Sequence, residues 1–363
     1  MHVVLSGYYG FDNVGDEAIL FSIIEALKKL QKDIQITVLS NNPESTKKTY
    51  DVQAVNRWKI NEVSNAIKQA DGLISGGGSL LQDQTGMKSI PYYCGIMQIA
   101  KMHKKPVFVY AQGMGPINKG ISKMIARNIL NKVNQITVRD EESKVLLEKI
   151  GVKKSITLVP DPVMGLDGNS FKSAWLENSP LGSEIGNYIS VSVRDWPTTV
   201  DYKRKIAESL DQLAGQGETI VFVPMHGEHD AKASREVAQL MKKDSLISPA
   251  HLSIEDKIAI IGQSKLLIGM RLHSLIFSSI YYTPFIAISY DPKIDSFARI
   301  AGQPIVGHVE QNNWDGHKLF EQAIDLLKNR QSATAAMKAT IQPIQNQALD
   351  TASLALNVIS KRS

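Results

Sequence analysis

The chain of 363 residues contains a single cysteine, Cys94, which excludes an intramolecular disulfide framework and is typical of a reducing compartment. Because Cys94 stands in the apolar stretch YYCGIMQIA, we expect a buried thiol and not a nucleophile. No apolar run approaches the roughly 18 residues of a transmembrane helix. The N-terminal MHVVLSGYYGF also lacks the basic and apolar regions of a signal peptide. These absences predict a cytoplasmic protein.

Nucleotide-binding motifs and a nucleic-acid-binding stripe are also missing. No Walker sequence is present, and SGGGSLLQD departs from G-x-G-x-x-G because position 81 is leucine. Lysine and arginine do not cluster with aromatic residues, so we exclude a nucleic-acid partner. The formal net charge of +5 fits either an ordinary solvated surface or attraction to anionic ligands or an acidic membrane face.

Apolar strands alternate with amphipathic helices along nearly the whole chain, which predicts an α/β fold with parallel sheets. The segment 165–186 breaks this alternation with glycine, asparagine, serine and proline, and it is the best domain boundary. The end of the chain is predicted to be mostly helical, with an interruption at QPIQ around Pro343. We expect two Rossmann-like domains facing a cleft over residues 1–165 and 166–335, and a C-terminal helical extension over residues 336–363.

Arginine stands at the ends of predicted strands in both halves, where ligands of open parallel sheets bind. Arg139 and Arg194 each occur in a VRD tripeptide that closes an apolar strand. A single VRD is best explained by a salt bridge to its own aspartate. Because both halves carry one, and Arg271 and Lys293 stand at other strand ends, we predict an anion site.

Other polar segments at strand ends allow more than one interpretation. The glycines of SGGGSLLQD, which precede a possible helix, predict either an anion-binding nest or a tight turn. Asn13 in FDNVGDE is best explained as a helix cap, whereas Asp16 fits a cap or a substrate hydroxyl contact equally well. The histidines of MHGEHD (225–230) are interpreted as polar loop residues, with sugar contact second, because their spacing does not match zinc motifs.

The segment GMRLHSLIF places Arg271 and His273 between two apolar stretches. In a strand, these two side chains would point to the same side. At a strand end beside a helix N-terminus, both could reach one anionic ligand. A lone histidine is usually a core residue, but the paired arginine and the nearby SYDPK favour a functional site.

Together, these segments resemble the polysaccharide pyruvyl transferase family, CsaB type. The resemblance spans residues 6–293 and rests on GYYGFDNVGDEAIL, SGGGSLLQD, YAQGMGP, VRDEES, DPV, GMRLHSLIF and ISYDPK. It implies a GT-B-like fold and transfer of pyruvate from phosphoenolpyruvate to two hydroxyls of one sugar, with release of phosphate. For the CsaB type it implies a lipid-linked precursor of a secondary cell-wall polymer as acceptor. The β-ManNAc residue of that precursor becomes a 4,6-ketal that anchors surface-layer proteins.

The resemblance also implies roles for individual residues. His273 is the expected acid, since its unperturbed pKa of about 6.5 suits proton transfer, and Lys293 is the competing acid or a phosphate ligand. Asp16 is the expected base or hydrogen-bond partner of the acceptor hydroxyl. The expected donor-binding residues are Arg139, Arg194, Arg271, His273, Ser274 and Lys293. The expected acceptor-binding residues are Tyr8, Asn13, Asp16, Gly77, Gly78, Ser79, Asp83 and Gln112.

Phosphoenolpyruvate is then a co-substrate, and neither a cofactor nor a metal is expected. The first domain would hold the acceptor and the second the donor, with peripheral contact at the inner face of the membrane as an option. Two alternatives stay open. A GT-B nucleotide-sugar glycosyltransferase or epimerase would bind a uridine nucleotide in the second domain. A non-catalytic saccharide-binding protein would keep its function after His273→Ala.

Overall fold

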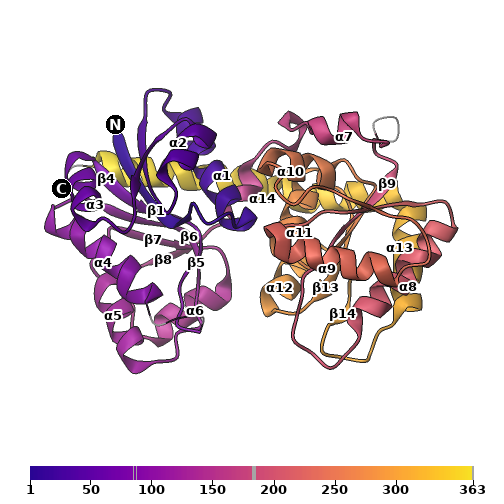
Figure 1. The fold of residues 1–363 in the computed structure, drawn as a ribbon. Coiled ribbons are helices and arrows are strands. Elements are labelled where there is room, and N and C mark those ends of the chain that lie inside the picture. The colour runs from indigo at the N-terminus through magenta and orange to yellow at the C-terminus, as the bar shows by residue number, and fades with distance from the viewer. Residues whose placement is uncertain (85, 87, 182–184, 362–363) are drawn as a thin grey trace. The chain divides into compact units, whose positions relative to one another are not determined.

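The computed structural model describes residues 1–84, 86, 88–181 and 185–361, and the chain divides into two compact units (Figure 1). Unit 1 comprises Met1–Leu166 and Ile344–Ser363, and unit 2 comprises Asp167–Pro343. Every strand pair among the described residues is parallel, and helices flank each sheet. The prediction of two Rossmann-like α/β domains is therefore confirmed.

The sheet of unit 1 has the strand order β3-β2-β1-β4-β6-β7-β8, with β5 paired to β6. Its strands are β1 (His2–Tyr9), β2 (Gln35–Ser40), β3 (Gln53–Asn56), β4 (Gly72–Ser75), β5 (Gly78–Leu81), β6 (Val107–Met114), β7 (Gln135–Val138) and β8 (Ile156–Leu158). Its helices are α1 (Val14–Leu30), α2 (Pro43–Tyr50), α3 (Ile60–Gln69), α4 (Ser89–Met102), α5 (Gly120–Leu130), α6 (Glu141–Lys149) and the 3-10 helix η1 (Pro162–Gly165).

The sheet of unit 2 has the strand order β11-β10-β9-β12-β13-β14. Its strands are β9 (Tyr188–Ser192), β10 (Thr219–Phe222), β11 (Leu246–Ile247), β12 (Leu266–Gly269), β13 (Phe285–Ser289) and β14 (Ile305–His308). Its helices are η2 (Gly168–Ser170), α7 (Ala174–Asn178), α8 (Tyr202–Gly215), α9 (Gly227–Leu240), α10 (Ile254–Gly262), α11 (Leu272–Ile280), α12 (Pro292–Ile300) and α13 (Gly316–Lys328).

Both sheets reverse their strand order at one place, between β1 and β4 in unit 1 and between β9 and β12 in unit 2. The connections from the strands on either side of such a point leave in opposite directions, which opens a crevice at the carboxyl ends of the strands. Most of the residues that the sequence analysis selected lie in the loops at these two places or in the adjoining ends of strands and helices.

The last helix, α14 (Arg330–Ser360), corrects two expectations about the end of the chain. It continues through Pro343, where the sequence predicted an interruption. Proline removes one hydrogen bond from a helix, and packing on both sides of it can outweigh that loss. Ile359 lies against Gly72, and Leu349 lies against Gly165. Residues 344–363 therefore belong to unit 1, whereas the sequence predicted a separate extension over residues 336–363.

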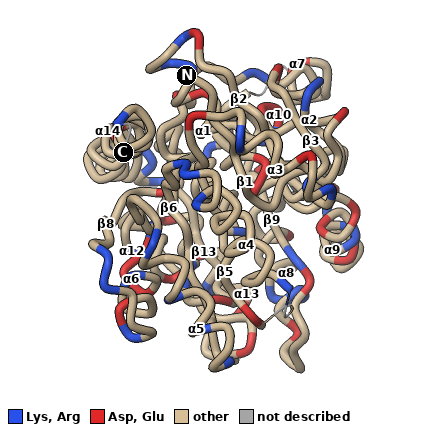
Figure 2. The backbone as a smooth tube through the Cα atoms, turned by 90° about the vertical axis from the view of Figure 1, so that its left-hand side faces the viewer, with Lys and Arg blue, Asp and Glu red and all other residues tan. Residues whose placement is uncertain are grey.

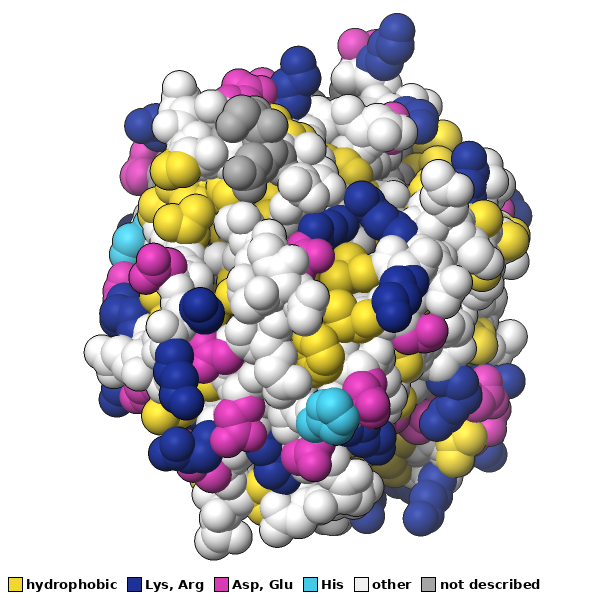
Figure 3. Space-filling model, turned by 90° about the vertical axis from the view of Figure 1, so that its right-hand side faces the viewer, with side chains coloured by type: hydrophobic (Ala, Val, Ile, Leu, Met, Phe, Trp, Pro, Cys, Tyr) yellow, Lys and Arg dark blue, Asp and Glu magenta, His cyan; other side chains and the backbone are white. Residues whose placement is uncertain are grey.

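Buried apolar side chains form the interior of both units, and Cys94 is among them, as predicted. Burial raises the pKa of its thiol to about 12, so the thiolate needed for nucleophilic attack is scarce at neutral pH. Charged residues of both signs are spread over the outer helices, and acidic and basic side chains are interspersed on the face shown in Figure 3 (Figures 2 and 3). None of the helices among the described residues has the length and apolar character needed to cross a membrane.

Candidate functional site

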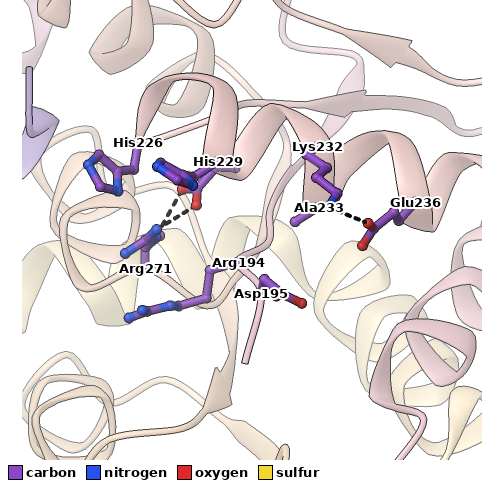
Figure 4. Close-up of a pocket in the computed structure, with 9 residues that line it drawn as sticks. Arg194, Asp195, His226, His229, Lys232, Ala233, Glu236 and Arg271 are labelled. Atoms are coloured by element: carbon purple, nitrogen blue, oxygen red, sulfur yellow. Dashed lines mark hydrogen bonds and ion pairs between the residues drawn. The ribbon is translucent and has the colours of Figure 1, made fainter. Parts of the chain in front are cut away.

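Unit 2 contains a pocket of about 310 Å³ at the carboxyl ends of β9, β10 and β12. Figure 4 shows one end of the pocket, where two arginines and two histidines lie close together, and a second end with residues of both charges. The first end is formed by Arg194, Arg271, His226 and His229, with Asp230 paired to Arg271, and the second by Asp195, Lys232, Ala233 and Glu236.

The two arginines are brought together by the register of neighbouring strands. Gly269 of β12 lies opposite Ser192 of β9, and each arginine follows two residues later. Arg271 is therefore not in a strand, as one interpretation of GMRLHSLIF supposed, but stands at the N-cap position of α11. Its Nε and Nη2 atoms donate to the two carboxylate oxygens of Asp230 at 2.9 and 2.5 Å. This bidentate pair fixes the guanidinium plane and leaves the Nη1 group without a hydrogen bond among the described residues.

Arg194 is held by aromatic rings. Its guanidinium carbon lies 4.4 Å from the centre of the Tyr290 ring and 5.1 Å from that of Trp196. Its buried Nε has no hydrogen-bond partner among the described residues. Lys293, in the first turn of α12, lies 5.9 Å from the same Tyr290 ring and forms an ion pair with Asp291 at 3.1 Å. The structure thus brings Arg194, Arg271 and Lys293 into one region of unit 2.

The histidines of MHGEHD belong to this site, which the sequence interpretation as polar loop residues missed. His226 is the N-cap residue of α9, and His229 lies in the first turn of the same helix, with the two ring centres 5.4 Å apart. Burial and then the positive charge of Arg271 lower the pKa of His226, against the attraction of Asp230. An anion in the pocket would relieve this repulsion. The signal in the sequence was the position of MHGEHD directly after a strand.

The acidic residues at the other end of the pocket are balanced by two lysines, of which Lys232 lies 3.9 Å from Glu236. Lys203 on α8 donates to Asp195 at 2.6 Å and to Glu236 at 2.5 Å. These bonds hold the pKa of Asp195 below its usual range. The free positive charge therefore remains at the end that carries the arginines and histidines.

His273 and Ser274 lie in the first turn of α11, directly after Arg271, and are not part of the pocket lining. The His273 ring is half-buried, with its centre 6.5 Å from that of Phe277 one turn later. The Ser274 hydroxyl donates to the carbonyl of Arg271 at 2.6 Å, which closes the first turn of the helix.

In unit 1, the glycines of SGGG make room for side chains and do not precede a helix, because β5 follows them. Gly78 has a φ of +90°, and a Cβ there would lie 2.5 Å from Oδ1 of Asp16. A Cβ on Gly77 would lie 2.9 Å from Ile19. Asn13 caps α1 by accepting from the Gly15 amide at 3.1 Å, as predicted. The missing side chains therefore let Asp16, in the first turn of α1, approach the end of β4.

Arg139 lies in unit 1, with the residues expected to bind acceptor. It pairs with the buried Asp161 at 2.8 Å and with Asp140 only at 3.8 Å, and its Nη2 donates to Ser79 at 3.3 Å. The strongest salt bridge is thus not the adjacent one that a lone VRD predicts. Asp161, which caps η1, was not selected from the sequence.

Three further residues of the expected acceptor set have different surroundings. Gln112 is buried and donates to Ser75 and Gly76 at 2.8 Å, while its Oε1 has no partner among the described residues. Asp83 accepts from the backbone amides of residues 118 and 119, which lower its pKa and anchor that loop. Tyr8 is exposed and stacks on Phe11. Among the described residues, no group of three histidine, cysteine or acidic side chains could hold a metal ion.

Comparison with known proteins identifies the family. Residues 13–292 match the model of the polysaccharide pyruvyl transferase family. The chain belongs to this family. One similar protein is the amylovoran biosynthesis protein AmsJ of Erwinia amylovora. It is 23% identical to this chain, and the alignment covers 87% of this chain and 90% of AmsJ.

Two solved structures illustrate the similarity of fold. A putative UDP-N-acetylglucosamine 2-epimerase from Listeria monocytogenes aligns with a TM-score of 0.69 and 12% identity, covering 99% of this chain and 95% of its own. HepE from Anabaena in complex with UDP-glucose aligns with a TM-score of 0.64 and 11% identity, and the alignment covers 99% of this chain and 98% of HepE. These similarities show that this pyruvyl transferase family member has a GT-B-like fold.

Proposed function

We propose that the protein transfers pyruvate from phosphoenolpyruvate to a sugar diol, forming a ketal and releasing phosphate. The observation that carries this proposal is the joint presence of Arg194, Arg271, His226 and His229 at one end of the pocket in unit 2. Phosphoenolpyruvate is small and carries both a carboxylate and a phosphate, so it needs several fixed cationic groups. No cofactor or metal takes part in the proposed reaction.

Arg271 and Arg194 bind the anionic groups of the donor. The ion pair with Asp230 holds Arg271 in place before the ligand arrives, so little of its side-chain entropy is lost on binding. Arg194 offers a guanidinium that is supported by the Tyr290 and Trp196 rings. His226, whose pKa is lowered in the free protein, takes up a proton when the donor binds and adds a positive charge beside the phosphate.

The reaction needs a proton at C3 of the donor and a nucleophile at C2. His273 supplies the proton in this proposal because it lies two residues after Arg271 in the first turn of α11, with Lys293 as the competing acid or a phosphate ligand. A sugar hydroxyl adds to C2 as C3 is protonated. The C2–O bond to phosphate then breaks, and the second hydroxyl closes the ketal and releases its proton.

Unit 1 holds the acceptor, with Asp16 as base or hydrogen-bond partner of the attacking hydroxyl. The approach of Asp16 to Gly78 at the carboxyl edge of the sheet supports this role. The proposed acceptor is the β-ManNAc residue of a lipid-linked precursor of a secondary cell-wall polymer, modified at O4 and O6. The protein would then act in the cytoplasm, in peripheral contact with the inner face of the membrane, and the product would serve to anchor surface-layer proteins.

The test is phosphate release from phosphoenolpyruvate by the purified protein, with and without a β-ManNAc-containing lipid-linked disaccharide. We expect acceptor-dependent release that His273→Ala lowers by roughly 10²–10⁴-fold, the usual contribution of an acid catalyst. His251→Ala is the matched control, because His251 is a highly exposed histidine in the same unit. Absence of release, together with tight binding of UDP, would contradict the proposal and favour a nucleotide-sugar enzyme.

A further inference from the structure

A cluster of aromatic rings surrounds Arg57 at the carboxyl edge of the sheet in unit 1. The guanidinium carbon lies 4.5–5.4 Å from the ring centres of Phe11, Trp58, Tyr92 and Tyr93. Arg57 is only 3% exposed, and it donates to the carbonyl of Gly7 at 2.8 Å and to the Tyr93 hydroxyl at 3.2 Å. Ring faces stabilise a buried cation, and in return the cation fixes the rings.

One member of the cluster, Trp58, and one ring stacked on the cluster, Tyr8, present aromatic surface to solvent. Trp58 is 59% exposed, yet its indole Nε1 donates to Asn41 at 2.9 Å, and its backbone amide donates to the Asn56 side chain at 2.9 Å. Tyr8 is 39% exposed and stacks on Phe11 with ring centres 4.1 Å apart and planes within 6°. We call Tyr8, Phe11 and Trp58 the aromatic shelf. The rings of Tyr8 and Trp58 are exposed but held in one orientation by these contacts.

Asp16 follows Phe11 of the aromatic shelf by five residues and lies in the first turn of α1. Burial raises the pKa of Tyr93 to about 12, and the charges of both Arg57 and Asp16 act on this hydroxyl. The loop between Tyr8 and Asp16 is also anchored, because the Gly10 amide donates to Glu17 at 2.7 Å. A ligand that presents a hydroxyl to Asp16 would therefore extend towards the aromatic shelf.

The chemistry of the aromatic shelf favours a neutral ring as ligand. Arg57 already occupies the position of a cation among the rings, which excludes an ammonium ligand there. The nearby Lys59 pairs with Glu62 at 2.9 Å and offers little free charge to an anion. A pyranose presents a face of C–H bonds that packs on the electron-rich face of an aromatic ring, while its hydroxyls remain in water.

We propose that the aromatic shelf is a saccharide subsite that binds a neutral pyranose of the acceptor next to the sugar presented to Asp16. This inference rests on the proposed function, since it takes unit 1 as the acceptor side. It predicts that the enzyme recognises at least a disaccharide, with the modified sugar at Asp16 and its neighbour stacked on Trp58.

Binding of saccharides can be measured without the donor. The probe is a panel of neutral disaccharide methyl glycosides, including one with terminal β-ManNAc, together with methyl β-ManNAc alone. In a ¹H–¹⁵N spectrum, the Trp58 indole signal is assigned by its loss in Trp58→Phe. We expect a disaccharide to shift this signal and methyl β-ManNAc to leave it in place. Trp58→Ala should weaken disaccharide binding by roughly fivefold to tenfold, and Trp58→Phe should weaken it less, because a flat ring remains.

Met102→Ala is the matched control and should leave disaccharide binding unchanged. Met102 is an exposed apolar residue at the C-terminal end of α4, whereas Tyr92 and Tyr93 lie near its N-terminal end. In the transfer assay, Trp58→Ala should raise KM for the acceptor and leave KM for phosphoenolpyruvate unchanged. Unaltered disaccharide binding by Trp58→Ala would overturn the inference, as would a Trp58 signal that responds to uridine and to no saccharide. If transfer fails but the disaccharide still binds through Trp58, the proposed reaction is wrong and the saccharide subsite stands.

Discussion

The ion pair between Arg271 and Asp230 should stabilise unit 2 as well as shape the donor site. Asp230 is 1% exposed, and the Arg271 side chain is 20% exposed. Removing one partner of a buried pair typically costs about 3–5 kcal/mol, because the other charge is left without compensation. Lys257, which acts electrostatically on Asp230, and water entering the pocket reduce this cost. We therefore expect Arg271→Met to lower the free energy of unfolding by about 3 kcal/mol.

Thermal and urea unfolding at pH 7, followed by circular dichroism, measure this effect. For a unit of this size, about 3 kcal/mol corresponds to a fall in Tm of roughly 10 °C. The double variant Arg271→Met/Asp230→Leu should recover at least half of the loss, since it buries no unpaired charge. The reasoning is refuted if Arg271→Met melts within about 2 °C of the wild type, or if the double variant is less stable than the single one.

Three further predictions concern a glycine and two titrating groups. Gly78→Ala should lower the rate of transfer to the acceptor at least tenfold and the free energy of unfolding by about 1 kcal/mol. The reason is that Gly78 has a φ of +90° and that the new Cβ would collide with Asp16. Steady-state kinetics and urea unfolding measure the two effects. His226 should take up a proton when phosphoenolpyruvate binds, because the bound anion raises the pKa that burial and Arg271 lower, so affinity rises as the pH falls. Calorimetry in buffers of different ionisation enthalpy should show this uptake, and His226→Gln should reduce it. The pKa of Lys257 is lowered by burial from 10.5 to about 8, so the unfolded state binds more protons between these values. The free energy of unfolding of the wild type should therefore rise from pH 8 to 10.5 relative to that of Lys257→Met. Parallel pH profiles of unfolding for the wild type and the variant would contradict this.

The sequence predicted the fold because the pattern that specifies it is local. Buried parallel strands appear as short apolar runs, and helices appear as apolar residues at helical spacing. The same reasoning placed Arg194 and Arg271 at strand ends. The order of the strands then sets them side by side, two residues beyond paired positions of β9 and β12.

The parts that were missed depend on contacts between distant residues. Asp230 pairs with Arg271 across 41 positions, so MHGEHD alone gave no sign of a buried carboxylate. Arg57 stands in VNRWKI, and nothing in that segment indicates a cation enclosed by Trp58 and by rings from two other places in the chain. Pro343 lies inside a helix because packing of α14 outweighs the local preference of proline. Local patterns carry no information on such contacts.

Transfer of the carbon skeleton of phosphoenolpyruvate to a sugar is the central claim, and isotope labelling tests it most directly. Phosphoenolpyruvate labelled with ¹³C at C2 is incubated with the protein and the β-ManNAc-containing lipid-linked disaccharide, and the purified saccharide is examined by ¹³C NMR and mass spectrometry. The account predicts a labelled ketal carbon coupled through O4 and O6 to the protons on C4 and C6 of one sugar, formed in equal amount to free phosphate. Phosphate release with the label recovered only as free pyruvate, or an unlabelled saccharide, would contradict it.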